Sequence, residues 1–322
     1  MSDAPIIGAV AIGRNEGDRL VACLAALQGR VDPIVYVDSG STDDSVAAAR
    51  AAGAHVVALD TSIPFTAARA RNAGLAALRA QAPEAAYVQF LDGDCVLQSG
   101  WIEAARTFLQ EHPQVAVACG RRREKFPDHS LYNRLIDAEW DTPVGDAKAC
   151  GGDALMRIDA LQEVGGYRDS LIAGEEPELC VRLRARGWTI QRLDAEMTLH
   201  DADLTRFGQW WRRAQRGGHA YAEGAALHGA PPERHKVRET RSALFWGAGL
   251  PILTLLGALL VSPWALALLL AYPAQMLRLR GKGAPWAQAV FIVLAKLPEA
   301  QGALQYWVKR LRGAESTLIE YK

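Results

Sequence analysis

Two carboxylates stand at the end of a short apolar run, in Asp92-Gly93-Asp94. The run before them, Ala86–Leu91, is rich in aromatic and β-branched residues and is typical of a buried strand. Carboxylates that follow such a strand lie at the carboxyl edge of a sheet, where open α/β sheets bind ligands. Their oxygen atoms suit a divalent cation, which in turn suits a diphosphate. A polar turn after a strand uses the same residue types, so this motif alone leaves both interpretations open.

A second acidic pair, Glu175-Glu176, precedes Pro177 and a helical pattern from Glu178 to Arg186. The helix dipole favours carboxylates at this end, so an ordinary acid-rich helix start competes with a catalytic pair. Further along, His200-Asp201 follows an expected strand at residues 189–193. A lone histidine is often structural, but here it offers a nitrogen ligand, and Asp201 offers a carboxylate that orients the imidazole.

The elements that position these residues alternate between strand and helix. Apolar runs predict strands, and helical spacing predicts helices between them. This alternation predicts an α/β fold with a mostly parallel central sheet and helices on both faces. Neither the dinucleotide-binding GxGxxG nor the phosphate-binding GxxxxGK[ST] motif is present where a strand would present it. The expected strands are 6–12, 33–37, 55–59, 86–91 and 115–119, and the expected helices are 18–28, 65–80 and 101–111.

Four segments, AIGRNEGDRL, VYVDSGSTDDS, FTAARARNAGL and FLDGD, occur in one order and spacing. Together they resemble the nucleotide-sugar half of a family 2 glycosyltransferase, and the resemblance covers residues 6–224. It implies a Rossmann-like glycosyltransferase A fold for a catalytic domain at 1–228. Residues 1–98 would form the nucleotide-binding half and residues 99–228 the acceptor and catalytic half.

The resemblance also implies roles for individual residues. Asp38 would accept a hydrogen bond from the nucleotide base, and Arg71 would approach the nucleotide. The metal ion, Mn²⁺ or Mg²⁺, would be held by Asp94, Asp92 and His200. The complete set expected to bind the nucleotide sugar is Asn15, Asp38, Ser39, Asp43, Arg71, Asp92, Gly93 and Gly152.

The general base that deprotonates the acceptor hydroxyl would be Glu176, with Glu175 as the alternative. An inverting transfer needs such a base because the attacking hydroxyl loses its proton as the new bond forms. The segment Gln209–Arg213 partly matches a QxxRW motif of processive relatives. Aromatic faces stack on sugar rings and arginines bind phosphate, so acceptor binding is expected at Trp210, Trp211, Arg212 and Arg213. An amphipathic helix at a membrane surface is the competing interpretation.

The composition of the chain argues against a nucleic-acid-binding protein and against a secreted, disulfide-bonded protein. The chain of 322 residues has 36 basic and 36 acidic side chains, so no net field favours nucleic acid. Its five cysteines have no CxxC spacing, which favours reduced intracellular thiols over disulfides or a zinc site. The first residues carry no basic region and no long apolar core, so a cleaved signal peptide is not expected.

An uncharged stretch from Ser242 to Leu277 exceeds the ~20 residues that a bilayer-spanning helix needs. Basic residues flank it on both sides, which favours a helical hairpin at 243–277 with both ends in the cytoplasm. A helical pair lying in one leaflet is the alternative. Residues 284–311 predict an amphipathic interfacial helix that breaks near Pro298. Residues 229–322 would thus form a membrane-associated helical region.

These observations lead to a metal-dependent, inverting glycosyltransferase at the cytoplasmic side of the inner membrane. The donor would be a nucleoside diphosphate sugar, first of all a UDP-sugar, and the acceptor a lipid-linked glycan or polyprenyl carrier. Two rivals stay open: a non-catalytic protein that binds sugar nucleotides or glycans on the same fold, and a nucleotidyltransferase. The sequence leaves the sugar, the linkage and the oligomeric state open.

Overall fold

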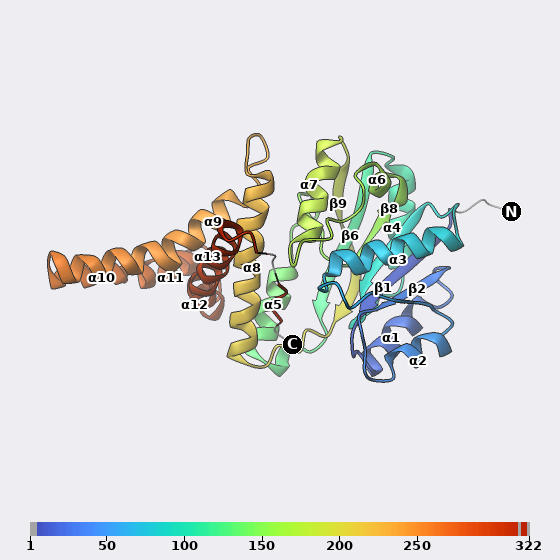
Figure 1. The fold of residues 1–322 in the computed structure, drawn as a ribbon, viewed down its shortest axis with the longest axis horizontal. Coiled ribbons are helices and arrows are strands. Elements are labelled where there is room, and N and C mark those ends of the chain that lie inside the picture. The colour runs from blue at the N-terminus through green and yellow to red at the C-terminus, as the bar shows by residue number, and fades with distance from the viewer. Residues whose placement is uncertain (1–4, 315–316, 321–322) are drawn as a thin grey trace. The chain divides into compact units, whose positions relative to one another are not determined.

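The computed structural model describes residues 5–314 and 317–320 (Figure 1). The chain divides into two compact units. The first runs to His129 and resumes at Ile136–Asp203; the second comprises Ser130–Leu135 and the chain from Leu204 onward. This division falls about one helix before the predicted boundary at residue 228, because helix α8 (Phe207–His228) packs against the C-terminal helix α13 (Lys296–Leu311).

A nine-stranded mixed sheet forms the core of the first unit. The strand order is β3-β2-β1-β4-β8-β6-β9-β5, and β7 pairs with β9. The parallel arrangement expected from the sequence holds for β3-β2-β1-β4 and for β6 with β9, whereas β5, β7 and β8 pair antiparallel. The predicted α/β fold is therefore confirmed, with antiparallel pairs in its second half. The strands are β1 Ile7–Gly13, β2 Ile34–Asp38, β3 His55–Ala58, β4 Tyr87–Asp92, β5 Cys95–Leu97, β6 Val115–Glu124, β7 Gly145–Ala147, β8 Ala154–Arg157 and β9 Thr189–His200.

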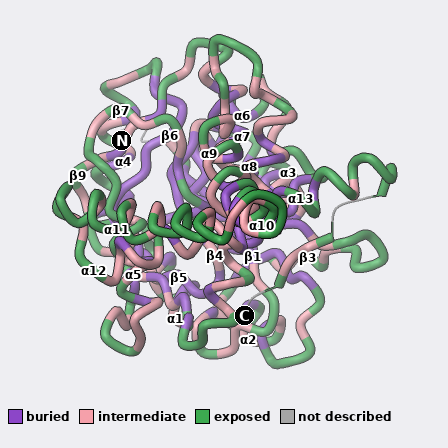
Figure 2. Tube along the Cα trace, turned by 90° about the vertical axis from the view of Figure 1, so that its left-hand side faces the viewer, coloured by how far each residue is buried: buried purple, intermediate pink, exposed green. Residues whose placement is uncertain are grey.

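The central strands are apolar on both faces because helices cover both sides of the sheet. Strands β1, β2 and β4 are buried over almost their whole length, and purple, the colour of buried residues, runs through the middle of the trace in Figure 2. Their register places Ile12 opposite Asp92 and Gly13 opposite Asp38. The carboxyl ends of these three strands therefore lie at one edge. The helices of this unit are α1 Asp18–Leu27, α2 Ser45–Ala51, α3 Ala67–Gln81, α4 Trp101–Glu111, the latter part of α5 Leu131–Trp140, α6 Ile158–Glu163 and α7 Glu175–Ala185.

Two helices carry Arg71 and the Glu175-Glu176 pair of the candidate site. Helix α3 starts at the cap residue Thr66, whose hydroxyl accepts from the Arg69 amide, and buries Arg71 in its second turn. Gly74 lets α3 approach the sheet closely, since a Cβ there would overlap Val10 and Val37. Helix α7 starts at Glu175, three residues earlier than the sequence pattern predicts, after Gly174 with φ 78°. Both acids of the pair thus lie in the first helical turn.

The second unit is helical. A helix of 24 residues, Val237–Leu260, is long and apolar enough to cross a bilayer, judged by length and composition alone, and is the one such helix in the described part of the chain. It comprises α9 (Val237–Leu244), a π-helical turn (Phe245–Gly249) and α10 (Leu250–Leu260). The chain turns at Ser262 and continues through a 3₁₀ segment (Pro263–Leu270) and α11 (Ala271–Gly281).

The predicted amphipathic helix at 284–311 is two helices, α12 (Trp286–Leu294) and α13, which meet at Ala295. Pro298 lies in the first turn of α13, where its missing N–H leaves no helical bond unmade. One face of α13 is buried against α8: Cβ atoms at Gly218 or Gly302 would overlap the backbone of the facing helix. This face of α13 therefore packs within the second unit, whereas Leu304, Val308 and Leu311 of the same helix are exposed.

Candidate active site

The turn after β4 is pressed against β1. The Gly93 amide donates to the Ile12 carbonyl at 2.8 Å, and a Cβ at Gly93 would come within 3.2 Å of that oxygen. Asp94 follows in a buried position, and its carbonyl accepts from the Asp201 amide at 3.1 Å. The end of β9 is thereby fixed beside the Asp92-Gly93-Asp94 turn.

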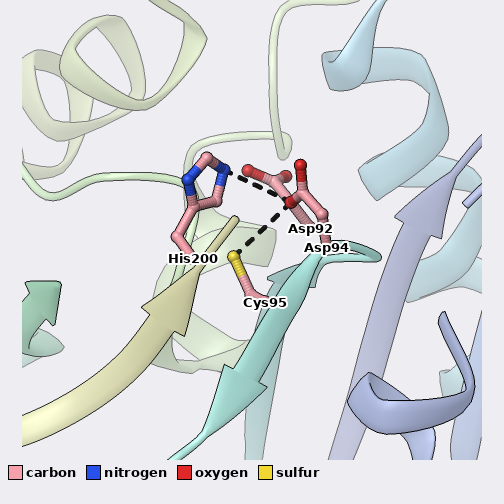
Figure 3. A group of neighbouring side chains, drawn as sticks. All are labelled: Asp92, Asp94, Cys95 and His200. Atoms are coloured by element: carbon pink, nitrogen blue, oxygen red, sulfur yellow. Dashed lines mark hydrogen bonds and ion pairs between the residues drawn. The ribbon is translucent and has the colours of Figure 1, made fainter. Parts of the chain in front are cut away.

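Four side chains converge here: Asp92, Asp94, Cys95 and His200 (Figure 3). One oxygen, nitrogen or sulfur atom from each lies within 4.8 Å of the others. His200 Nε2 is 3.3 Å from Asp94 Oδ1, and the Cys95 thiol donates to the same oxygen at 3.7 Å. Antiparallel pairing of β5 with β9 aligns Cys95 with His200.

This donor set fits a divalent cation. Two carboxylates and an imidazole are ligands of Mn²⁺ and related ions. His200 Nδ1 is buried without a hydrogen-bond partner among the described residues, so neither an acceptor nor a donor fixes the tautomer from that side. Burial raises the pKa of the Cys95 thiol well above its usual value, with the nearby carboxylates Asp153 and Asp94 adding to the rise. The thiol is therefore protonated, and the fit to a cation rests on Asp92, Asp94 and His200.

Arg71 joins this cluster to the acidic pair on α7. Its Nη2 is 2.9 Å from Asp92 Oδ1, and its Nη1 is 2.8 Å from both Glu175 Oε1 and Glu176 Oε1. The guanidinium is almost fully buried and also faces the Tyr167 ring, 5.7 Å from its centroid. The Arg71 guanidinium thus forms ion pairs with three carboxylates in a site that solvent hardly reaches.

The burial of this site and its charges shift the pKa of Glu176. The pKa of Glu176 is raised to about 7, first of all by burial and then by the neighbouring Glu175, while Arg71 opposes the rise. A carboxylate with a pKa near neutrality exchanges its proton readily, which is the property of a general base. The side chain of Glu176 is 13% exposed and that of Glu175 only 5%, so Glu176 is the more accessible of the two.

Gly152 closes the space between these groups. A Cβ at this position would meet Arg71 Nη2 at 2.5 Å, Glu176 Oε1 at 3.2 Å and Asp92 Oδ2 at 3.3 Å. The neighbouring Gly151 has nothing within 4 Å of such an atom. Glycine is therefore needed at 152 for a close approach, and not at 151.

Arg122 and Asp153 also lie in this site. In the sequence, the basic segment Arg121–Lys125 fits either a solvated face or a contact to phosphate or acceptor, and the role of Asp153 stays open. Arg122 lies in the site, with Nη2 2.6 Å from Asp153 Oδ1 and 3.5 Å from Asp92 Oδ2. Arg123, on the other hand, forms an exposed ion pair with Glu196. Successive side chains of a strand point to opposite faces, so Arg122 and Arg123 on β6 lie on different sides of the sheet. This alternation is the signal in the sequence that could have separated the two arginines.

Asn15, Asp38, Ser39 and Asp43 lie in the turns after β1 and β2. Asp38 Oδ2 accepts from the amides of Gly40 and Ser41 at 3.1 and 3.0 Å, a local turn arrangement. Asn15 has φ 56°, and its side-chain oxygen accepts from the Thr42 amide at 2.7 Å. Asp43 accepts from the Ser45 amide, and its hydrogen bonds with Ser45 lower its pKa. The Ser39 hydroxyl is buried without a partner among the described residues. These bonds hold the two turns together.

The four residues expected to bind the acceptor lie on α8, in the second unit. Trp210 is buried, with its ring 4.8 Å from that of Phe291, and the Trp211 indole donates to Gln301 at 3.1 Å. Arg212 is exposed and Arg213 is half-buried. Trp211, Arg212 and Arg213 keep polar or exposed surface, whereas Trp210 serves the packing of α8.

Comparison with known proteins agrees with this architecture. The family model described as glycosyl transferase family 2 matches residues 11–163. A pre-mycofactocin glycosyltransferase of Mycobacterium tuberculosis (strain H37Rv) is 28% identical over 226 residues, covering 64% of this chain and 45% of that protein. The chain spans about half the length of the curated relatives it matches.

Solved structures share the fold. The mannosyltransferase PcManGT from Pyrobaculum calidifontis, in complex with GDP-Man and Mn²⁺, has a TM-score of 0.63 and 18% identity, covering 94% of this chain and 88% of that chain. Residues 1–349 of TarS from S. aureus have a TM-score of 0.52 and 15% identity, covering 96% of this chain and 92% of that chain. The predicted family and fold are confirmed: residues 11–163 belong to glycosyl transferase family 2, on a glycosyltransferase A fold.

Proposed function

We propose that this protein is an inverting glycosyltransferase that moves a sugar from a nucleoside diphosphate to an acceptor hydroxyl. The observation that carries the proposal is the position of Arg71 between Asp92 and Glu176. A candidate cation site and a carboxylate of pKa about 7 thus flank one guanidinium. A leaving diphosphate needs positive charge and an attacking hydroxyl needs a base, and both are available within this site.

In the proposed reaction, Glu176 accepts the proton of the acceptor hydroxyl as its oxygen attacks C1 of the donor sugar. The new C1–O bond forms while the bond from C1 to the nucleoside diphosphate breaks, so a single displacement inverts C1. Arg71 neutralises part of the charge on the leaving diphosphate. Asp92, Asp94 and His200 would hold a divalent cation, Mn²⁺ or Mg²⁺, which when bound supplies further charge to the same leaving group.

Glu176 is proposed as the base in preference to Glu175. Both contact Arg71 Nη1, but Glu175 is the more deeply buried. Its carboxylate raises the pKa of Glu176 and helps to fix Arg71. Glu175 is therefore proposed to act through its effects on Glu176 and Arg71 and not on the acceptor itself.

For the donor, we propose a UDP-sugar first and a GDP-sugar as the alternative. The base and ribose would bind near Asn15, Asp38, Ser39, Asp43 and Gly93, at the ends of β1, β2 and β4. Gly152 would leave room for the donor sugar beside Arg71. The GDP-Man bound by PcManGT makes the guanine nucleotide worth testing on the same fold.

For the acceptor, we propose a lipid-linked glycan or polyprenyl carrier, met at the cytoplasmic face of the inner membrane. This proposal is supported by the exposed apolar side chains of α10 and the following 3₁₀ segment, several of them more than half exposed. Trp211, Arg212 and Arg213 on α8 are the proposed acceptor contacts. A hairpin at 243–277 would attach the protein to the bilayer.

The test offers a panel of UDP- and GDP-sugars with Mn²⁺ to the full chain in lipid nanodiscs, together with polyprenyl phosphate and short glycan acceptors. Released nucleoside diphosphate is measured with and without a chelator. The proposal expects acceptor-dependent release that the chelator abolishes. Release of pyrophosphate would instead indicate a nucleotidyltransferase, and nucleotide binding without any turnover would indicate a non-catalytic binding protein.

A further inference from the structure

Arg122 on β6 is held in one orientation from two sides. Its Nε and Nη2 contact the two oxygens of Asp153 at 2.8 and 2.6 Å. Asp153 is fully buried and also accepts from the Thr198 hydroxyl at 2.6 Å. The guanidinium carbon lies 5.2 Å from the centroid of the Trp140 ring. One hydrogen bond from Nε, the close ion-pair contact of Nη2 and the aromatic face together fix the plane of this guanidinium.

The same guanidinium faces the candidate cation site. Its Nη2 lies 3.5 Å from Asp92 Oδ2, while Asp92 Oδ1 binds Arg71. The Asp92 carboxylate thus lies between two arginines that come from β6 and α3. Because Asp92 belongs to the cation cluster, an anion held there would lie within reach of both.

Part of Arg122 is left for a ligand. Asp153 uses Nε and Nη2, whereas Nη1 has no hydrogen-bond partner in the part of the chain that the structure describes. The side chain is 15% exposed, so the guanidinium is not sealed off from solvent. A buried ion pair adds little net stability compared with an apolar pair of similar volume. The stability of the fold therefore gives little reason for an arginine at this position. Binding of a phosphate gives a better one, because a guanidinium forms strong charge-assisted hydrogen bonds with phosphate oxygens.

We propose that Arg122 binds the distal phosphate of the donor's diphosphate, with Asp153 as its positioning residue. This inference rests on the proposed function, because it takes the ligand to be a nucleoside diphosphate. The distal phosphate carries the oxygen that leaves C1, so Arg122 would stabilise the charge that develops there. Arg71 and Arg122 would then flank the leaving group from two sides of Asp92.

The experiment measures binding by calorimetry with the full chain in detergent micelles and Mn²⁺, using UDP, UMP, GDP and GMP as probes. The variants are Arg122→Ala and Arg122→Lys. The matched control is Arg123→Ala, which removes the same charge from the next residue of β6, in an exposed pair with Glu196. Thermal melting checks that each variant is folded.

Arg122→Ala is expected to weaken binding of the diphosphate about 10–100-fold and that of the monophosphate less than about twofold, in line with one lost charge-assisted hydrogen bond. Arg122→Lys should recover part of the loss, and Arg123→Ala should change neither affinity. An equal loss for diphosphate and monophosphate, or no loss, overturns the assignment while leaving the proposed function intact. A wild-type protein that binds none of the four probes overturns both.

Discussion

Arg71 Nη1 lies 2.8 Å from Glu176 Oε1, and the other amino group of the same guanidinium lies 2.9 Å from Asp92 Oδ1. The two carboxylates come from distant parts of the first unit, Asp92 from the end of β4 and Glu176 from the first turn of α7. The buried guanidinium of Arg71 therefore contacts both the candidate base and the candidate metal site.

The rate of transfer should depend on pH through Glu176. Because its pKa is raised to about 7, mostly by burial, the carboxylate is protonated below that pH and cannot accept the hydroxyl proton. We expect kcat/KM to fall about tenfold per pH unit below pH 7 and to level off above it. Steady-state kinetics from pH 5.5 to 8.5 check this limb. A flat profile over that range would contradict a base with this pKa.

Asp94→Asn should weaken Mn²⁺ binding by at least about tenfold, since it removes one charged oxygen ligand beside His200. Titration of Mn²⁺ into the protein, followed by electron paramagnetic resonance, gives the affinity. Asp60→Asn is the control, because Asp60 is an exposed turn residue that accepts from the Ser62 amide. Equal Mn²⁺ affinity in the Asp94 variant and the wild type would place the cation elsewhere.

Gly152→Ala should reduce transfer strongly while the protein stays folded. The added methyl would lie 2.5 Å from Arg71 Nη2, so the guanidinium must move away from Asp92 and Glu176. We expect a loss of about 10²-fold, as for small displacements of catalytic groups. Gly151→Ala meets nothing within 4 Å and should keep wild-type activity. If both alanine variants transfer sugar equally well, close approach at 152 has no catalytic importance.

Membrane attachment should depend on the tip of the apolar hairpin. Leu260 is 78% exposed, and a glutamate there would place a charge where we propose hydrocarbon, at a cost of about 2–3 kcal/mol. We expect Leu260→Glu to lower the fraction that floats with liposomes. Val144→Glu is the control, an exposed apolar residue of the first unit. Unchanged flotation of the Leu260 variant argues against insertion of this tip.

The sequence predicted the parts of the fold that depend on local pattern. The bounds of α4 and the positions of β1, β2 and β4 follow from apolar runs and helical spacing, and their parallel order follows from the alternation. The turn at Ser262 follows from the serine and proline that interrupt the apolar stretch. The predicted start of α7, Glu178, is three residues too late. The residues Glu175, Glu176 and Pro177 have no apolar position that would mark them as helical, and the N-cap at Gly174 is visible only in the structure.

Contacts between distant strands could not be predicted in this way. Cys95 joins the cation cluster because β5 pairs with β9, 100 or more residues further along the chain, and no local pattern reports that pairing. Arg122 and Asp153 meet because β6 and β8 are neighbours in the sheet. The burial of Trp210 likewise depends on α12, whose Phe291 covers its ring.

Replacing Glu176 by glutamine tests whether this side chain is the general base, since glutamine keeps the size of the side chain and cannot accept the proton. Glu176→Gln, Glu175→Gln and the exposed control Glu196→Gln are compared for nucleoside diphosphate release with donor, acceptor and Mn²⁺ at pH 8. We expect Glu176→Gln to lower kcat by about 10²–10⁴-fold while donor affinity is kept, Glu175→Gln to lose less, and Glu196→Gln to keep wild-type activity. Wild-type turnover by Glu176→Gln would exclude Glu176 as the base.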